Sequence, residues 1–518
     1  MSFTAIKSGL ILGLKAYLVK VECDIGRGMN AFSLIGLGDK AIDESKDRVC
    51  SSLRNAGYTN PQQTNHRTTI SLAPGDLRKE GTNFDLPIAL AYLIANKEIE
   101  YRECDIEESM FVGELSLKGN IGKLKGALAI AELAEKNGIK NLFLPKENGE
   151  EAALIKNLNV YPVSSLTEVI DHITGKRKIE KLKETDPKDF QKEEEKSIID
   201  MKDIKGQTAA KRALLIAAAG GHNIVMYGPP GTGKTMLARA SRDLLPDLDY
   251  KNILEVTRIH SIVGSNEIGK NNLILKAPFR SPHHTSSYVS LVGGGSVPKP
   301  GEVTLAHGGV LFLDEFPEFE LKTIEALREP LEEGHVSISR AKGTEKFPAK
   351  FMLIGAMNPC PCGNRGNKDK KCICTVNDIS RYERKLSGPI LDRIDIWVNV
   401  SNISYEELGL KDDKAEGSEI FKNKILKARE KMQERFKDTN GKIEMNRDMS
   451  SKDIEHFANL DDATRKELNI YATKLHLSPR AYHRLLRVAR TIADLEYKEN
   501  IELPHILEAL QYRPKVNG

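Results

Sequence analysis

The sequence predicts an α/β fold built from three parts. Between residues 200 and 400, short apolar stretches alternate with segments of helical length, a pattern typical of a parallel sheet covered on both faces. Residues 1–172 mix strand-like alternation with helical periodicity, which indicates a separate α/β domain. Strand signals end near residue 400, so residues 401–518 are expected to form a helical lid. The run of Lys and Glu within 173–199 predicts a solvated linker.

Local periodicity places the individual elements. In the first domain, β-rich runs predict strands at 17–23, 32–37, 68–72 and 142–144, with helices ending near Gly57 and Asn137. In the second, apolar runs predict strands at 223–227, 310–313, 351–356 and 396–400. In the third, the spacing predicts amphipathic helices over 420–436 and 480–497.

Composition sets bounds on the class of protein. The 518 residues are 40% hydrophobic and 29% charged, which fits a globular chain of several domains. The net charge of +4 does not argue for nucleic acid, so any basic surface must be local. No apolar run reaches the roughly 18 residues that cross a bilayer, and no membrane partner is expected. Seven unevenly spread cysteines predict a cytoplasmic location.

A phosphate-binding loop is the clearest motif. It matches the pattern G-x-x-x-x-G-K-[ST] between an apolar run and the start of a helix, and its residues are Gly228, Pro229, Pro230, Gly231, Thr232, Gly233, Lys234 and Thr235. Backbone N–H groups and the helix N-terminus suit the phosphates of ATP. Lys234 can reach the β and γ phosphates, and the Thr235 hydroxyl can hold Mg²⁺. The alternative is a Gly-rich turn with an incidental lysine.

Carboxylates and an amide follow the next apolar strands. Asp314 is expected to bind Mg²⁺ and Glu315 to orient or deprotonate the attacking water, while Asn358 can contact the γ-phosphate or that water. An ordinary solvated helix start is the alternative for the Asp-Glu pair. Arg393 is either an arginine finger for the nucleotide of a neighbouring subunit or a partner of Asp392 or Asp395.

Several stretches together resemble the magnesium-chelatase-related AAA+ family over essentially the whole chain. They are residues 278–285 (PFRSPHHT), 298–302 (PKPGE), 358–362 (NPCPC), 386–393 (LSGPILDR) and 477–484 (LSPRAYHR). The resemblance implies a hexameric ring ATPase that acts as a DNA helicase and promotes branch migration during natural transformation, with recombination proteins as further partners. It places the finger on Arg393 and the sensor-2 arginine on Arg480, with Arg484 as the second choice.

Other functions remain open beside this one. The first is the ATPase motor of a magnesium-chelatase-type complex, although such motors are expected to resemble only the central and C-terminal parts of this chain. The second is an ATP-dependent peptidase. Residues 113–122 and 138–145 resemble the proteolytic domain of Lon-type peptidases, but Asn83 stands where its serine is expected, and Thr82 is a poor substitute. We therefore expect a Lon-like scaffold without peptidase chemistry, even though Lys123 or Lys125 lies nearby in sequence.

Two insertions carry basic residues that suit the phosphates of DNA in a central channel. They are a predicted hairpin around residues 335–351 and the Gly- and Pro-rich segment 278–302, and the candidates are Arg280, His283, His284, Arg340 and Lys342. Arginines 480, 484, 487 and 490 share one helix face, and Asp494 is spaced to pair with Arg490. For each of these residues a solvated surface role is the alternative.

Four cysteines form a compact pattern, C-x-C-x₉-C-x-C, at Cys360, Cys362, Cys372 and Cys374. Four thiolates converging from a loop can bind a structural Zn²⁺ tetrahedrally, although the pairs are one residue closer than in the usual C-x₂-C spacing. Reduced loop cysteines or redox-labile pairs are the alternatives. Nearby lysines would offset the charge of a four-thiolate site.

Overall fold

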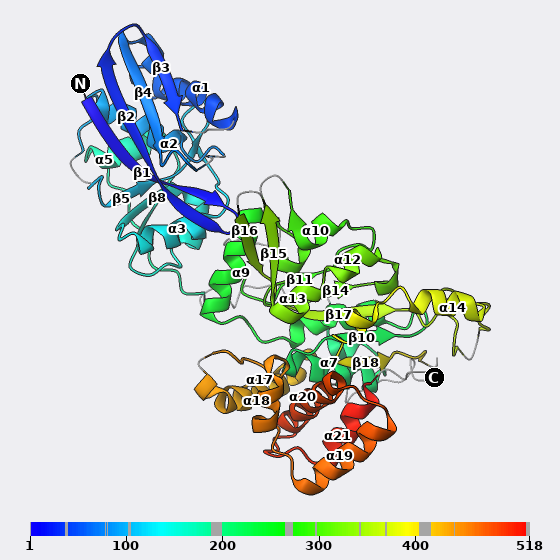
Figure 1. The fold of residues 1–518 in the computed structure, drawn as a ribbon. Coiled ribbons are helices and arrows are strands. Elements are labelled where there is room, and N and C mark those ends of the chain that lie inside the picture. The colour runs from blue at the N-terminus through cyan, green and yellow to red at the C-terminus, as the bar shows by residue number, and fades with distance from the viewer. Residues whose placement is uncertain are drawn as a thin grey trace. The chain divides into compact units, whose positions relative to one another are not determined.

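The computed structural model (Figure 1) divides into two compact units, and each is described here by itself. Unit 1 comprises residues 1–194 and 249–275, and unit 2 comprises 195–248 and 276–518. The structure describes residues 2–36, 40–77, 79, 81–101, 105–187, 199–264, 273–295, 298–340, 343–367, 370–403, 416–439 and 441–513.

Unit 1 is built on a seven-stranded mixed sheet. In spatial order its strands are β3 (Ala31–Ile35), β4 (His66–Ala73), β2 (Lys15–Arg27), β1 (Ser2–Leu12), β5 (Ser109–Phe111), β8 (Asn141–Pro145) and β9 (Asn159–Val163). Strands β1, β2 and β4 pair antiparallel, whereas β5, β8 and β9 continue the sheet in parallel. The strand predicted at 17–23 is the second strand of the long hairpin formed by β1 and β2.

Helices pack on this sheet. Among the described residues, the helices of unit 1 are α1 (Lys40–Asn55), α2 (Asp85–Ala95), α3 (Ala127–Lys136), α4 (Gly149–Ala152), α5 (Leu166–Ile173) and α9 (Tyr250–Val263). Helix α2 is apolar on nearly every side and almost fully buried. Helix α9 packs against α3, where Arg258 pairs with Glu132 at 3.1 Å and the Ser261 hydroxyl accepts from the Gly126 N–H at 2.9 Å. It therefore belongs to unit 1, although its residues fall in the range predicted for the ATPase core.

Unit 2 contains the predicted parallel sheet. Its order is β11 (Phe279–Arg280), β14 (Val310–Leu313), β17 (Met352–Met357), β10 (Ile224–Tyr227) and β18 (Ile396–Asn399), and every neighbouring pair is parallel. Four of these strands lie within one residue of the predicted positions. Their near-continuous hydrophobic runs reflect burial on both faces.

The sheet separates two hydrophobic cores. Along β14, Val310 and Phe312 face one core while Leu311 and Leu313 face the other, because successive side chains of a strand point to opposite faces. The first core includes helices α7 (Thr208–Gly220) and α8 (Lys234–Ala240), and the second includes α10 (Tyr288–Val292), α11 (Glu302–Leu305), α12 (Leu321–Glu325) and α13 (Arg328–Glu333).

The second core also receives a hairpin. Strands β15 (His335–Arg340) and β16 (Gly343–Pro348) pair antiparallel in a register that opposes Arg340 and Gly343, which confirms the predicted hairpin. Lys342 and the side chain of Arg340 lie outside the described residues.

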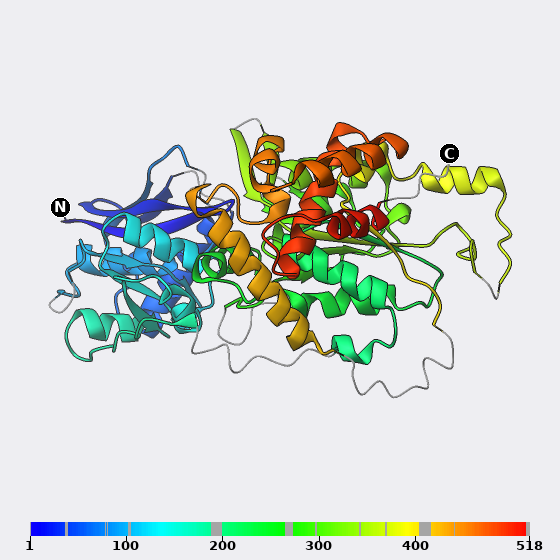
Figure 2. The same ribbon diagram turned by 90° about the horizontal axis from the view of Figure 1, so that it is seen from below.

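The C-terminal part adds helices to the first core and no strand among the residues described from 416 onward. They are α17 (Ser418–Arg435), α18 (Ser451–Phe457), α19 (Asp462–Lys474), α20 (Pro479–Leu495) and α21 (Leu503–Gln511). In Figure 2, α17 is the long gold helix, and it packs against α7 within the core. Helix α20 buries Leu485, Val488 and Ile492 against the same core. Among the described helices, none is both long and apolar enough to span a bilayer.

Candidate nucleotide site and metal centre

The phosphate-binding loop connects β10 to α8. Gly228 lies against the end of β18, where a Cβ atom would come within 2.0 Å of the Val400 carbonyl oxygen, so no larger residue fits. Gly231 and Gly233 instead adopt left-handed backbone conformations (φ +79° and +91°) with open space around them. Glycine is needed there for its conformation, because other residues pay steric strain at positive φ.

Lys234 is the first residue of α8, and its side chain folds back under the loop. Its Nζ donates to the carbonyl oxygens of Gly228 (2.7 Å) and Pro229 (2.8 Å) and lies 3.4 Å from Oδ1 of Asn358. Burial lowers the pKa of Lys234, and the charge of Asp314 opposes that shift. Asn358 follows β17, so three segments that are distant in sequence meet around this ammonium group.

Thr235 and Asp314 face each other beside the lysine. The Thr235 hydroxyl donates to Oδ2 of Asp314 at 2.8 Å, while Oδ1 of Asp314 accepts the N–H of Glu315. A hydroxyl and a carboxylate in this arrangement supply the oxygen ligands that Mg²⁺ prefers. The structure thus brings Lys234 and Thr235, at the start of α8, together with Asp314 and Asn358, which follow β14 and β17.

Glu315 has a left-handed backbone (φ +51°), which is uncommon for a non-glycine residue and turns the chain sharply after β14. Its Oε2 lies 3.0 Å from Nδ1 of His284, a residue of the insertion 278–302. The His283 and His284 rings contact each other with centroids 4.2 Å apart and planes tilted by 33°. No spacing rule in the sequence links His284 to Glu315, so this contact was not predicted.

The other DNA candidates of this insertion make local contacts. Arg280 forms a two-pronged ion pair with Glu302, with N···O distances of 2.6 and 2.9 Å. His283 hydrogen-bonds the Thr285 hydroxyl at 2.9 Å. The guanidinium of Arg280 is therefore already engaged by a carboxylate.

Arg393 is buried, with 6% of its surface exposed. Its guanidinium donates to the carbonyl oxygen of Pro389 and pairs with Glu332 of α13. Among the described residues, Arg393 therefore forms its ion pair with Glu332. The alternative expectation, an ion pair with Asp392 or Asp395, was wrong. A long-range partner of this kind leaves no signal in local spacing.

Arg393 lines a cavity of about 450 Å³ that is rich in arginine. The basic and histidine side chains that line it are Lys350, Arg393, Lys442, Arg447, Arg480, His483, Arg484 and Arg487. Buried nitrogens of Arg393, Arg487 and His483 have no hydrogen-bond partner within the described structure. Among the residues that the structure describes, the lining includes none of the phosphate-binding loop. Arg447 and His483 were not predicted to belong to a site.

An acidic residue stands at the wall of this cavity. Burial alone would raise the pKa of Asp395, but its hydrogen bond and charge interaction with His222, followed by the charges of Arg484 and Arg487, lower it to about 2. Arg484 pairs with Asp395 at 3.9 Å.

Arg490 has a different environment from the other arginines of α20. It is fully buried and bonded to Asp494 and to the carbonyl oxygens of Lys498 and Glu499. The pairing with Asp494 is confirmed, whereas a solvated basic face is wrong for this residue.

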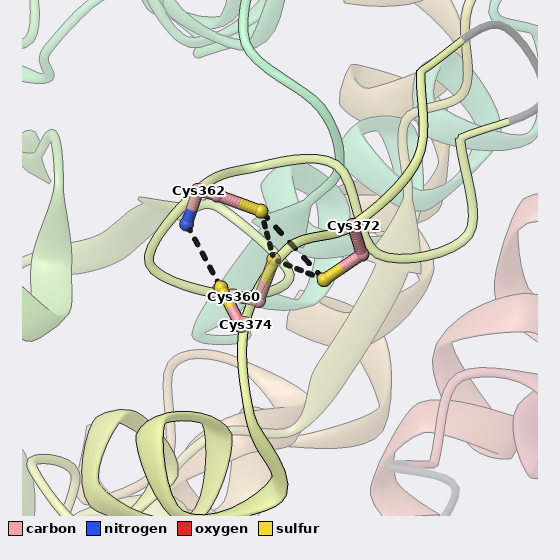
Figure 3. Close-up of side chains that lie close together, drawn as sticks. All are labelled: Cys360, Cys362, Cys372 and Cys374. Atoms are coloured by element: carbon pink, nitrogen blue, oxygen red, sulfur yellow. Dashed lines mark hydrogen bonds between the residues drawn. The ribbon is translucent and has the colours of Figure 1, made fainter.

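The side chains of Cys360, Cys362, Cys372 and Cys374 converge (Figure 3). One ligand atom from each lies within 4.8 Å of those from the others. The measured sulfur–sulfur distances are 3.4 Å (Cys360–Cys362), 3.7 Å (Cys360–Cys372) and 3.6 Å (Cys362–Cys372). Hydrogen bonds from the backbone, first of all at Asn364, lower the pKa of Cys362 to about 6. The cluster can hold a metal ion.

The segment around Thr82 and Asn83, where the serine of a Lon-type peptidase was expected, has its own polar contacts. The Thr82 hydroxyl donates to Glu114 at 2.6 Å, and the carbonyl of Asn83 accepts from the Gly113 N–H at 3.0 Å. Lys79 is fully buried and donates to the Pro74 carbonyl. These contacts are structural in character.

Family models match three consecutive parts of the chain. They are described as "Subunit ChlI of Mg-chelatase" (residues 21–148), "Magnesium chelatase, subunit ChlI" (200–408) and "Magnesium chelatase, subunit ChlI C-terminal" (415–513). A chelatase description therefore matches unit 1 as well, contrary to the expectation that only the later parts would resemble a chelatase motor.

Curated relatives match over the full length. The chain is 42% identical to competence protein ComM of Haemophilus influenzae over 516 residues, covering 100% of this chain and 98% of that protein. It is 40% identical to YifB of Escherichia coli over 99% of this chain and 97% of that protein. The Magnesium-chelatase 67 kDa subunit of Chlorobaculum parvum is 30% identical over 30% of this chain and 23% of its own.

The parallel sheet, the phosphate-binding loop and these matches define a magnesium-chelatase-like ATPase. Within that class, the chain belongs to the magnesium-chelatase-related family of the ComM and YifB type.

Proposed function

We propose that this protein is an ATP-driven DNA translocase that works as a homo-hexameric ring and promotes branch migration of recombination intermediates. One observation carries the proposal. Arg393, the finger candidate, lies in a cavity whose described lining includes no residue of the chain's own phosphate-binding loop. An arginine placed in this way can serve a nucleotide only if a neighbouring subunit brings that nucleotide to it.

Within one subunit, the residues divide the work of hydrolysis. Lys234 and the loop amides bind the phosphates, Thr235 and Asp314 hold Mg²⁺, Glu315 orients or deprotonates water, and Asn358 positions that water or the γ-phosphate. Arg393 of the adjacent subunit neutralises charge that develops on the γ-phosphate, an effect worth about 10³–10⁵ in rate. Arg480 lies in the same cavity and acts with it as the sensor-2 arginine.

DNA is proposed to contact the two insertions of unit 2. The hairpin β15–β16 extends from the second core, and the insertion 278–302 places His284 beside Glu315. A DNA strand that moves this insertion would change the surroundings of the catalytic carboxylate, which supports coupling of DNA binding to hydrolysis. Unit 1 is proposed as a Lon-like scaffold, and the C-terminal helices as the lid of the ATPase.

The proposed cofactors are ATP, Mg²⁺ and a structural Zn²⁺. ATP and Mg²⁺ follow from the residues around Lys234 and Asp314, and Zn²⁺ from the four convergent thiols.

A magnesium-chelatase motor is the second candidate, favoured by the descriptions of the matching family models. Relatives that match essentially the whole chain, including unit 1, include proteins named competence protein ComM and YifB, which favours the DNA function. ATPase stimulation separates the two: forked DNA stimulates a translocase, whereas porphyrin-binding partner subunits stimulate a chelatase motor.

The direct test measures ATP hydrolysis and strand displacement on forked DNA for Lys234→Ala. Both activities should fall to background, because the phosphates lose their cation. Lys427→Ala on the exposed side of α17 is the matched control and should behave as wild type. Intact DNA-stimulated hydrolysis and strand displacement by Lys234→Ala would refute the proposal.

A further inference from the structure

The cysteine cluster lies beside the nucleotide site. We propose that Cys360, Cys362, Cys372 and Cys374 bind one zinc ion, and that this ion holds Asn358 and Pro230 in their working positions, so that ATP hydrolysis depends on the metal. This coupling rests on the proposed ATPase function, whereas the metal site itself does not.

The positions of three of the sulfurs fit a single tetrahedral ion, and Sγ of Cys374 lies within 4.8 Å of each of them. A zinc–sulfur bond of about 2.3 Å at tetrahedral angles puts the sulfurs about 3.8 Å apart. The three measured distances of 3.4, 3.7 and 3.6 Å are close to that value. A disulfide would need about 2.05 Å, so redox-paired cysteines do not describe this arrangement.

Backbone N–H groups point at the same sulfurs. The N–H of Cys362 donates to Sγ of Cys374, and the N–H of Arg365 donates to Sγ of Cys360, both at 3.4 Å (Figure 3 shows the first). Such bonds stabilise thiolate ligands around a metal, because they spread the negative charge over nearby dipoles.

The loop that carries the cysteines has little apolar packing of its own. Ile373 is 83% exposed and Val376 is 80% exposed, whereas Cys360 is fully buried. A segment that cannot bury its apolar side chains needs another source of order, and metal binding supplies folding free energy directly. In the described part of the loop, the convergent thiols therefore take the place of a core.

One close contact and two chain connections link the cluster to the nucleotide site and to α14. Cys360 follows Asn358 by two residues, and Asn358 lies 3.4 Å from Nζ of Lys234. At Gly363 (φ +76°), next to Cys362, a Cβ atom would lie 2.7 Å from Cδ of Pro230 in the phosphate-binding loop. The last cysteine, Cys374, precedes Thr375, the N-cap of α14 (Val376–Glu383).

Helix α14 also contacts Asn358, through Tyr382. Tyr382 of α14 is buried, and burial is the main reason that the pKa of its hydroxyl rises to about 12. A hydrogen bond between Tyr382 and the backbone of Asn358 opposes this rise. The ion thus joins the end of β17 to the start of α14, and both ends of this connection contact Asn358. Loss of the ion should displace Asn358, and a shift of about 1 Å in a positioning group can cost ~10²-fold in rate.

The first experiment measures metal content and kinetics of the full chain. Native protein should contain one zinc per chain, and Cys372→Ser should contain none. A chelator selective for zinc, used with excess Mg²⁺, should lower kcat about 10–100-fold with a smaller change in ATP affinity, and added Zn²⁺ should restore kcat. Ile373→Ser, which alters an exposed neighbour and no ligand, should keep both zinc and activity.

The second experiment separates metal binding from its coupling to hydrolysis. Gly363→Ala keeps all four thiols but forces the loop away from Pro230, so zinc should stay at one per chain while kcat falls. Gly366→Ala is the matched control, because Gly366 has the same backbone conformation (φ +77°) with nothing within 4 Å of its Cβ position. It should retain both zinc and kcat.

Several results would overturn the inference. Native protein with no zinc, or with iron in its place, would remove the site. Zinc-free protein that hydrolyses ATP at the native rate would remove the coupling. Failure of the proposed function looks different, because Lys234→Ala would then keep DNA-stimulated hydrolysis, whereas a working ATPase predicts that this variant loses hydrolysis and still carries one zinc per chain.

Discussion

The contact between His284 and Glu315 predicts that the insertion 278–302 restrains hydrolysis until DNA arrives. Oε2 of Glu315 lies 3.0 Å from Nδ1 of His284, and a carboxylate held there is not free to orient water at the γ-phosphate. His284→Ala removes the restraint without touching the phosphate-binding loop. ATP hydrolysis without DNA should therefore rise, while the DNA-stimulated rate should change little.

The size of the effect follows from the exposure of the two side chains. His284 is 31% exposed and Glu315 is 54% exposed, so solvent screens the pair and its contribution is about 0.2–1 kcal/mol. That free energy corresponds to an increase of about 1.4- to 5-fold in basal rate.

The assay compares steady-state ATP hydrolysis with and without forked DNA at equal protein concentration. His456→Ala, which removes an exposed histidine from α18, is the control and should match wild type in both conditions. A basal rate that falls or stays unchanged in His284→Ala would refute the restraint, and a fall would mean that His284 supports Glu315 during hydrolysis.

Two further predictions concern stability. Asp494 is fully buried and accepts hydrogen bonds from Arg435, Arg490 and Asn446. Because Asp494→Ala leaves a buried guanidinium without its carboxylate, it should lower the free energy of unfolding, measured by chemical denaturation, by about 3–5 kcal/mol. The control Asp462→Ala, at an exposed position, should lower it little. A loss below about 1 kcal/mol for Asp494→Ala would contradict the buried network. The pKa of Asp395 in the folded protein, about 2, lies below its unfolded value of about 3.9. Its ionised form therefore stabilises the fold above pH 4 by about 2–3 kcal/mol, and this contribution is lost as pH falls toward 2. The difference in stability between wild type and Asp395→Asn should therefore shrink over that interval, and a difference that is constant with pH would count against the shift.

The sequence predicted the sheet of unit 2 and the residues around Lys234 because both leave local signals. A buried parallel strand is a continuous apolar run, and the phosphate-binding loop is contiguous, so neither depends on knowing which distant segments meet. Asp314 and Asn358 followed from the same logic, since parallel strands end at one edge of the sheet.

Features that depend on packing between distant segments were missed. Nothing near Arg393 in sequence indicates Glu332. The helical spacing of α20 pairs Arg490 with Asp494, but it does not indicate that Arg490 is buried while Arg480 lines a cavity. Likewise, α9 packs on α3 of unit 1 through contacts more than 100 residues apart in the chain. Periodicity reports which face of an element is apolar, but it does not identify the element that covers that face.

The central claim is that a nucleotide held by Lys234 of one subunit is hydrolysed with Arg393 of the next. The most direct measurement mixes two inactive variants, Lys234→Ala and Arg393→Ala, at equal concentration and follows ATP hydrolysis. Random mixing in a ring pairs an intact Lys234 with an intact Arg393 at one interface in four, so the mixture should recover roughly a quarter of the wild-type rate. A mixture that remains as inactive as its components would show that each subunit needs both residues in its own chain.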